Sequence, residues 1–263
     1  MMPADLVRLD LRLRRRMLIG TAAGTAAYLF LVVAVYPTFK QDGAMDAMIA
    51  ANPAAAAAFG ISGSITSPAG WLSANMYANF GPLLALLLTI GYGSAAVAGQ
   101  DGDGLLGLLA TLPVTRTRLL AAKVVSLLLA ALVIPGVSYA VCLAGPHFQL
   151  HPQWGALLGV SIALTLLAFD LGAVALLVGA ATGGRGVAMG AASAVAACAY
   201  LISSLSPLVD LVHRVRWASP FFWAVGDGQL TRGVTMGELG ALVGLGVILV
   251  GATIAAFGRL DIH

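Results

Sequence analysis

Six long apolar stretches divide the chain, and segments of different length with charged, proline or glycine residues separate them. Each stretch is long enough to cross about 30 Å of hydrocarbon as an α-helix. No stretch shows the strict alternation of polar and apolar positions that favours a strand. The pattern therefore predicts an all-α integral membrane protein with six transmembrane helices, at residues 17–36, 77–99, 119–144, 154–182, 187–206 and 238–257.

The composition indicates the same environment. Hydrophobic residues make up 60% of the chain and charged residues only 10%, and the mean hydropathy is +0.95. Soluble domains hold about 25% charged residues, so this chain could not cover a water-facing surface. We expect one transmembrane domain over residues 1–263. The first apolar run has spanning length and no small-residue cleavage site follows it, so we expect a retained helix and not a signal peptide.

The basic residues predict the orientation. Ten of the fourteen lysines and arginines fall on the side of the two termini in a six-span arrangement. Since cytoplasmic loops carry the excess of positive charge, both termini are expected in the cytoplasm of a multi-pass cell-membrane (plasma-membrane) protein. The net charge of +3 is modest, and the basic residues cluster near the ends of the spans. No nucleic-acid partner is therefore expected.

The last external loop, residues 207–237, does not fit this bias. It places Arg214, Arg216 and Arg232 outside, and it is also rich in tryptophan and phenylalanine. We expect the loop to lie at the outer membrane interface, where such aromatic residues are frequent, or to fold back against the bundle.

The N-terminal segment LVRLDLRLRRR, residues 6–16, places leucines at helical spacing between arginines. This favours an amphipathic interfacial helix over about residues 4–16, with its arginines near anionic head groups of membrane lipid. The alternative is a positive flank that only fixes the orientation. The expected membrane-surface residues are Arg8, Arg12, Arg14, Arg15 and Arg16.

Between the second and third spans lies QDGDGLLGLLATLPVTR, residues 100–116. Its leucines at 105, 108, 109 and 112 form one apolar stripe on a helix. Asp101 and Asp103 stand at the start, where negative charge suits the helix dipole, and Pro113 ends the helix. We predict a short amphipathic cytoplasmic helix that presents one face to the bundle and the other to a soluble partner.

This segment resembles the cytoplasmic loop of ABC-2 type transporter permeases. In that family acidic residues precede a leucine-rich helix, Leu-Pro-Val-Ser-Arg follows it, and a lysine stands in the next span. The matching residues here are Asp101, Gly104, Leu106, Leu108, Leu109, Leu112, Pro113, Val114, Thr115, Arg116 and Lys123. The pieces SPAGWL at 67–72 and FGRLDI at 257–262 also resemble family patterns. The departures are Gln100 and Gly107 in place of acids, Leu105 in place of threonine and Leu260 in place of arginine.

The resemblance implies a membrane subunit of an ATP-driven transporter, usually an exporter. A second permease copy, identical or related, and two ABC ATPase subunits would complete it, with ATP and Mg on the ATPases. The chain itself is then not an enzyme and has no catalytic residue, bound cofactor or metal. The cargo expected is a hydrophobic or amphipathic drug, peptide or lipid-like molecule. The implied ATPase-coupling residues are Asp101, Asp103, Gly104, Leu106, Leu108, Leu109, Pro113, Val114 and Arg116.

The nearest approach to a phosphate-binding loop is GAATGGRG, residues 179–186. It has arginine where lysine is required and no serine or threonine after it. The glycines instead indicate a tight turn between the fourth and fifth spans. Glycine pairs at four-residue spacing, such as Gly20/Gly24 and Gly240/Gly244, permit close helix packing, although the 32 glycines make chance pairs expected.

Asp170 is the one acid deep in a predicted span. A carboxylate there is costly, so Asp170 is a candidate residue of the translocation path, for a cation or a proton. The alternative is a packing residue that is protonated or hydrogen-bonded, with Ser138, Tyr139 or Ser193 as possible partners. An ATP-independent secondary transporter or channel that uses Asp170 is the rival function, although it gives the 100–116 helix no purpose. An intramembrane serine protease is disfavoured because no histidine falls in a predicted span, and a non-transporting scaffold with this fold stays open.

Overall fold

The computed structural model describes residues 3–41, 43–52, 64–96 and 116–257, and all regular elements in these ranges are helical. Six helices there are long and apolar enough to cross a membrane, which confirms the predicted all-α, six-span fold. The second span begins at Pro68, well before the predicted residue 77. The six are α2 (Arg15–Phe39), the continuous run of α5 (Pro68–Leu72), η1 (Ser73–Tyr77) and α6 (Phe80–Ser94), α9 (Arg116–Cys142), α10 (Trp154–Thr182), α11 (Arg185–Leu205) and α15 (Met236–Phe257).

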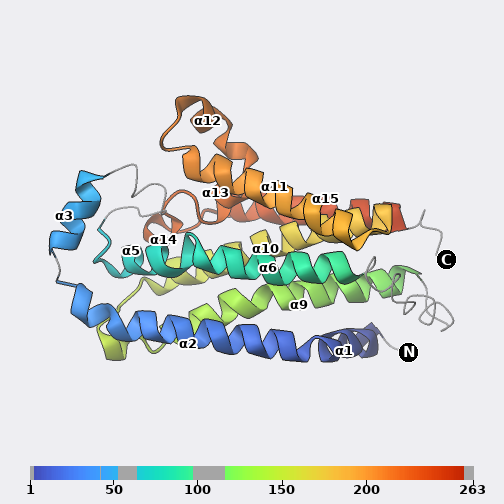
Figure 1. Ribbon diagram of the computed structural model, residues 1–263, viewed down its shortest axis with the longest axis horizontal. Helices are drawn as coiled ribbons and strands as arrows, with labels where there is room; N and C mark the ends of the chain where they lie inside the picture. Colours follow the sequence, from blue (N-terminus) through green and yellow to red (C-terminus); the bar gives the residue numbers. More distant parts are fainter. Residues whose placement is uncertain (1–2, 42, 53–63, 97–115, 258–263) are drawn as a thin grey trace.

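The six spans lie side by side along the long axis of the molecule (Figure 1). Helices α2 and α9 lie on one side, α11 and α15 on the other, and α6 and α10 between them. We call the end at which α2 begins and α15 ends the terminal end, and the opposite end the distal end. Helix α1 (Pro3–Leu13) continues from α2 at the terminal end and packs against α9.

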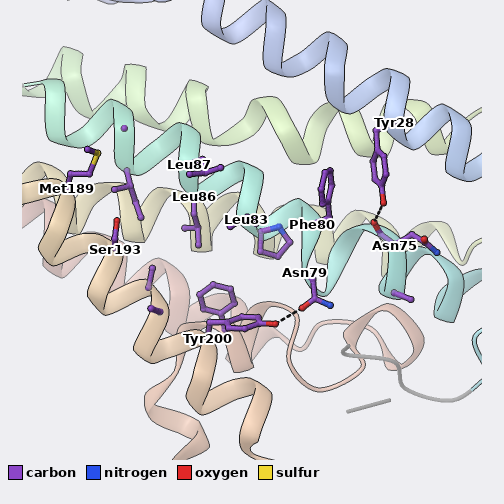
Figure 2. A pocket seen from close by; sticks show the side chains of 17 residues that line it. Tyr28, Asn75, Asn79, Phe80, Leu83, Leu86, Leu87, Met189, Ser193 and Tyr200 are labelled. Carbon is purple, nitrogen blue, oxygen red and sulfur yellow. Dashed lines mark hydrogen bonds between the residues drawn. The ribbon is translucent and has the colours of Figure 1, made fainter. Parts of the chain in front are cut away.

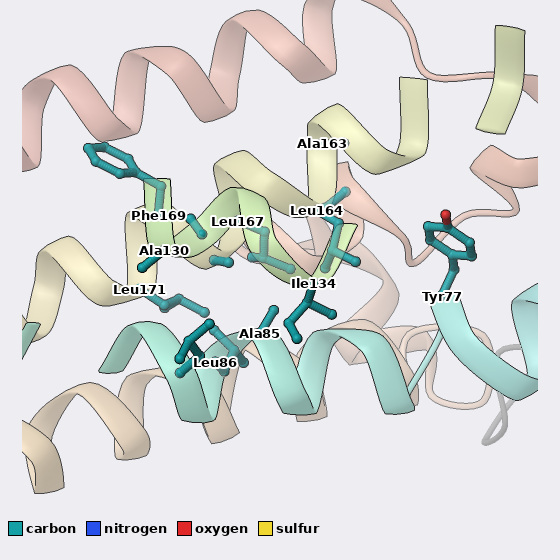
Figure 3. Close-up of a cluster of buried hydrophobic side chains, with 14 of the residues drawn as sticks. Tyr77, Ala85, Leu86, Ala130, Ile134, Ala163, Leu164, Leu167, Phe169 and Leu171 are labelled. Carbon is teal, nitrogen blue, oxygen red and sulfur yellow. The ribbon is translucent and has the colours of Figure 1, made fainter. Parts of the chain in front are cut away.

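Helix α10 is the centre of the bundle. It packs against α6, α9, α11 and α15, and 72% of its most apolar stretch is buried, against 17–50% in the other spans. Figure 3 shows Leu164 and Leu167 of α10 close to Ala85 of α6 and to Ala130 and Ile134 of α9. A helix that is apolar all round is expected at such a position.

Two glycines let α6 and α10 approach each other closely. A methyl group on Gly93 would lie 2.2 Å from the carbonyl oxygen of Gly172. A methyl group on Gly172 would lie 2.7 Å from Leu127 Cδ1 and 2.9 Å from Thr89 Cβ. Backbones come this close only where small residues face each other. By contrast, the glycines of the pairs at 20/24, 186/190 and 240/244 all face open space.

Short helices connect the spans. The turn expected in the 179–186 segment is present: α10 ends at Thr182, and Gly183 adopts a positive φ of 65° before α11 begins. The distal loops contain α3 (Gly43–Ala51), η3 (Gly145–Phe148), α12 (Asp210–Val215), η4 (Arg216–Ala218), α13 (Pro220–Ala224) and α14 (Gln229–Arg232).

The last loop is tied to the bundle by a buried carboxylate. Glu238, at the start of α15, accepts a hydrogen bond from the backbone N–H of Thr235 at 2.7 Å and pairs with Arg232. Arg232 also pairs with Asp227 at 3.1 Å. Helices α13 and α14 pack on α10, so this part of the loop folds back against the bundle. One of the three misfit arginines is thereby neutralised within the protein.

Replacing Gly93 by alanine should destabilise the bundle by about 1–3 kcal/mol, because the new methyl group meets a backbone oxygen that cannot move away alone. Thermal unfolding of the purified protein in detergent measures this. Gly91 lies on the same helix, and a methyl group there meets nothing within 4 Å. Gly91→Ala is therefore the matched control, and equal melting temperatures for the two variants would contradict the crossing described above.

Candidate functional site

A groove of about 790 Å³ runs between α6 and α11. Its floor is apolar, with Leu83, Leu86 and Ile90 from α6 and Met189 and Ala196 from α11 (Figure 2). Among the described residues that line it, none is charged. The volume lies in the range of small-molecule binding sites, and the lining suits a ligand with a large apolar part.

The groove becomes polar towards the distal end. Tyr28 of α2 donates a hydrogen bond from its hydroxyl to the backbone oxygen of Asn75 at 2.9 Å. Tyr200 of α11 donates to Asn79 Oδ1 at 2.7 Å and so bridges the two walls. Figure 2 shows both bonds at the same end of the groove, and the Tyr28 ring packs against Phe80 with centroids 4.4 Å apart. Uncharged hydrogen-bonding groups therefore lie at the distal end of an otherwise largely apolar groove.

The shape of the groove follows from the faces that its two walls bury. Helix α11 packs on its neighbours through small residues at helical spacing, Ala188, Ala192, Ala196 and Ala199. Helix α6 buries the face that carries Ala85 and Gly93. The opposite face of α6, with Leu83 and Leu87, is left exposed and becomes a wall of the groove.

A buried ion pair lies at the terminal end, and we call it the Asp10 clasp. Lys123 Nζ of α9 donates to Asp10 Oδ1 of α1 at 2.6 Å, and both side chains are buried. The hydroxyl of Tyr92, near the end of α6, donates to Asp10 Oδ2. The Arg14 guanidinium carbon stands 4.5 Å from the centroid of the Tyr92 ring, a cation–π contact. The clasp thus joins α1, α6 and α9.

The electrostatics of Arg14 fit this arrangement. Burial lowers the pKa of its guanidinium, Asp10 opposes that effect, and the neighbouring Arg185 adds to it. An arginine stays protonated even so. The clasp therefore holds one carboxylate near two cations, and removal of Asp10 would leave the buried Lys123 and the half-buried Arg14 without a counter-charge.

The clasp fixes α1 to the end of α6 and to the first turns of α9, the two helices that the segment at 97–115 connects. Tyr92 lies just before that segment and Lys123 just after it. Sequence reasoning included Lys123 only as a family match and missed Asp10 and Tyr92. A signal was present: an acid among arginines and a lysine inside an apolar span are opposite charges that need partners.

Asp170 lies elsewhere, at the packing surface of α10 and α15. It is only 1% exposed, and neither carboxylate oxygen has a hydrogen-bond partner among the described residues. A methyl group on Gly246 of α15 would lie 2.8 Å from Asp170 Oδ1. Asp170 is not among the residues that line the groove, and its role in translocation stays a prediction.

The predicted coupling residues fall mostly outside the described ranges. This holds for Asp101, Asp103, Gly104, Leu106, Leu108, Leu109, Pro113 and Val114. Arg116 begins α9, and nothing further is described of its side chain. The terminal FGRLDI piece is described only at Phe257.

The membrane-surface arginines are placed on α1 and at the start of α2. Arg8, Arg12, Arg15 and Arg16 are exposed, whereas Arg14 is half-buried over Tyr92. Leu6 is buried, while Leu9 and Leu13 are exposed. Contact of this surface with lipid stays a prediction.

Comparison with known families gives one match. A family model described as ABC-2 family transporter protein matches residues 5–262, nearly the whole chain. No curated protein matches the chain significantly.

Replacing Asp10 by leucine should destabilise the protein by about 3–5 kcal/mol, because Lys123 then stays buried without its counter-charge. The double variant Asp10→Leu/Lys123→Met should recover most of this loss, since it removes both charges. A double-mutant cycle of thermal unfolding in detergent measures the coupling, with Arg8→Leu, an exposed site on the same helix, as control. A loss in the double variant equal to the sum of the losses in Asp10→Leu and Lys123→Met would show that the pair does not interact.

Proposed function

Because the chain belongs to the ABC-2 transporter family, we propose that it is the membrane subunit of an ATP-driven exporter of hydrophobic or amphipathic compounds. ATP hydrolysis would take place on a separate ABC ATPase subunit. The observation that carries the choice of cargo is the groove between α6 and α11, with its apolar floor and its uncharged polar distal end. A drug, a hydrophobic peptide or a lipid-like molecule has matching chemistry.

The proposed orientation places the terminal end in the cytoplasm and the distal end outside the cell membrane. The support is the excess of basic residues at the terminal end. A soluble ATPase would then meet the segment between α6 and α9, because α6 ends and α9 begins at that end. ATP and Mg belong to that partner.

The proposed assembly holds two permease copies and two ATPase subunits. The groove is only partly enclosed by this chain, so one chain supplies only part of a closed path. A second copy, identical or related, would supply the rest. Most soluble homo-oligomers close by such symmetry.

The proposed coupling runs through the Asp10 clasp. Movement of the segment at 97–115 by the ATPase would displace the ends of α6 and α9 together, because Asp10 joins both to α1. Displacement of α6 changes its distance from α11 and so opens or closes the groove between them. The Tyr200–Asn79 hydrogen bond would break and form again as the distal end opens and closes.

One observation favours a second candidate function. Asp170 is a buried carboxylate without a hydrogen-bond partner among the described residues, which is typical of groups that take up protons or ions within membranes. An ATP-independent secondary transporter or channel would use it. The absence of Asp170 from the groove lining makes this the weaker candidate.

Filling the groove should block export without changing partner binding. Ala197 is an exposed lining residue of α11, and Ala197→Trp should lower ATP-dependent efflux of a fluorescent amphiphile by about tenfold, an effect of about 1.4 kcal/mol. Ala194→Trp adds the same side chain at an exposed position of the same helix outside the lining and should have little effect. Efflux that is equal for the two variants would remove the groove from the transport path.

Acids in the apolar stripe of the cytoplasmic segment should abolish ATPase recruitment. Leu108→Asp with Leu109→Asp removes the face expected to pack, while the protein should remain in the membrane. Gly107→Glu is the matched control, because it adds an acid where the family pattern has one. Co-purification of the ATPase with each variant measures recruitment, and wild-type recruitment by the double variant would overturn the assignment of this segment.

A further inference from the structure

A short helix leaves the bundle sideways at the distal end. Helix α12 and the turn η4 follow the end of α11 after four residues. Figure 1 shows α12 on the far side of α11 from α2 and α9, whereas α3 and the distal end of α2 extend further along the long axis. Segment 206–218 therefore lies beside the bundle and not beyond it. Where the six spans are embedded in a bilayer, a segment beside the bundle at the distal end can be reached by lipids of the distal leaflet.

The exposed side chains of this segment suit lipid. Leu211 is 73% exposed, Trp217 57% and Val215 50%, and Leu208 and Val209 are also exposed. Leu211 and Val215 are four residues apart and share one face of α12. So much exposed apolar surface on a six-residue helix is unfavourable in water, whereas tryptophan and leucine side chains are at home in the interfacial region of a membrane.

Basic side chains stand among these apolar ones. Arg214 is exposed on α12. The Arg216 guanidinium carbon lies 5.3 Å from the centroid of the Trp217 ring and 5.1 Å from that of the Phe222 ring. Arg216 also donates to a ring nitrogen of His213, whose Nδ1 lies 3.2 Å from the backbone oxygen of Ser206. Rings and hydrogen bonds thus hold this guanidinium in place.

The held guanidinium of Arg216 belongs to a side chain that is only half-buried. Its Nε is buried and has no hydrogen-bond partner among the described residues, so a ligand would meet the accessible part of the group. A guanidinium fixed beside apolar groups at a membrane surface suits a phosphate oxygen, which accepts charge-assisted hydrogen bonds. The only acid in residues 206–218 is Asp210, against two arginines, so the segment favours a negative ligand.

We propose that segment 206–218 is an anchor in the distal leaflet that binds the phosphate of a phospholipid headgroup through Arg214 and Arg216 and prefers lipids of net negative charge. The anchor accounts for the two arginines of this loop that Glu238 and Asp227 do not neutralise. The proposal needs only the membrane location of the chain. It does not depend on the cargo, the ATPase or the direction of transport.

Quenching of Trp217 by lipids with brominated chains tests the anchor. The full chain is placed in phosphatidylcholine nanodiscs that contain a minor fraction of brominated phosphatidylglycerol or of brominated phosphatidylcholine. The Trp217 signal is the part of the fluorescence that Trp217→Phe lacks, since Trp71, Trp154 and Trp223 also emit. Quenching by the anionic lipid should exceed that by the zwitterionic lipid by about fivefold for each arginine involved.

Variants assign the preference to the named residues. Arg214→Gln should reduce the preference for the anionic lipid, and Arg214→Gln/Arg216→Gln should abolish it. Asp210→Asn should increase this preference. Arg8→Gln/Arg12→Gln removes two exposed arginines from the terminal end and should leave it unchanged. Arg214→Gln changes only an exposed side chain, so its effect is interpretable even where the double variant folds poorly.

Three results would overturn the proposal. Equal quenching by the two lipids would show no headgroup recognition. Absence of quenching by either would place the segment in water or against a second protein copy. A preference that stays unchanged in Arg214→Gln/Arg216→Gln would assign it to another part of the chain and not to this segment.

Discussion

The close crossing of α6 and α10 at Gly93 and Gly172 is the constraint on which the rest of the bundle depends. Helix α10 is the most buried of the spans, and it holds α6 and α11 at positions that leave a groove between them. In lipid there is little hydrophobic driving force between helices, so association rests on close packing. A side chain at either glycine would move α6 outward and change the groove along with the core.

Helix α6 connects the parts of the proposed transport cycle. Tyr92 of the Asp10 clasp directly precedes Gly93 of the crossing, and Gly91 beside them lines the groove. At the opposite end, Asn79 directly precedes α6 and lies at the polar distal end of the groove. A rigid helix pivoting about a close crossing would carry movement from the clasp to the opposite end. The proposed coupling therefore needs no separate relay between the cytoplasmic segment and the path.

Much of the fold could be predicted from the sequence, because long apolar runs leave few choices in lipid. The six spans could be predicted from hydropathy alone, and the turn at Gly183 from the glycines in that segment. The site was harder, because it depends on which faces meet. Spacing drew attention to pairs such as Gly20/Gly24, which face open space, whereas Gly93 and Gly172 lie on different helices and have no sequence signature. Likewise Asp10 and Lys123 are more than a hundred residues apart, so their pairing follows only from the packing of α1 on α9.

The proposed function requires a separate ATPase that drives the bundle from its terminal end. The most direct test is gentle purification of the tagged chain from its native host, followed by mass spectrometry of the proteins that accompany it. The account predicts a near-stoichiometric soluble subunit whose sequence contains the phosphate-binding pattern G-x-x-x-x-G-K-[ST]. A chain that purifies alone, even after crosslinking in the presence of ATP, would contradict it and would favour a transporter that works without ATP.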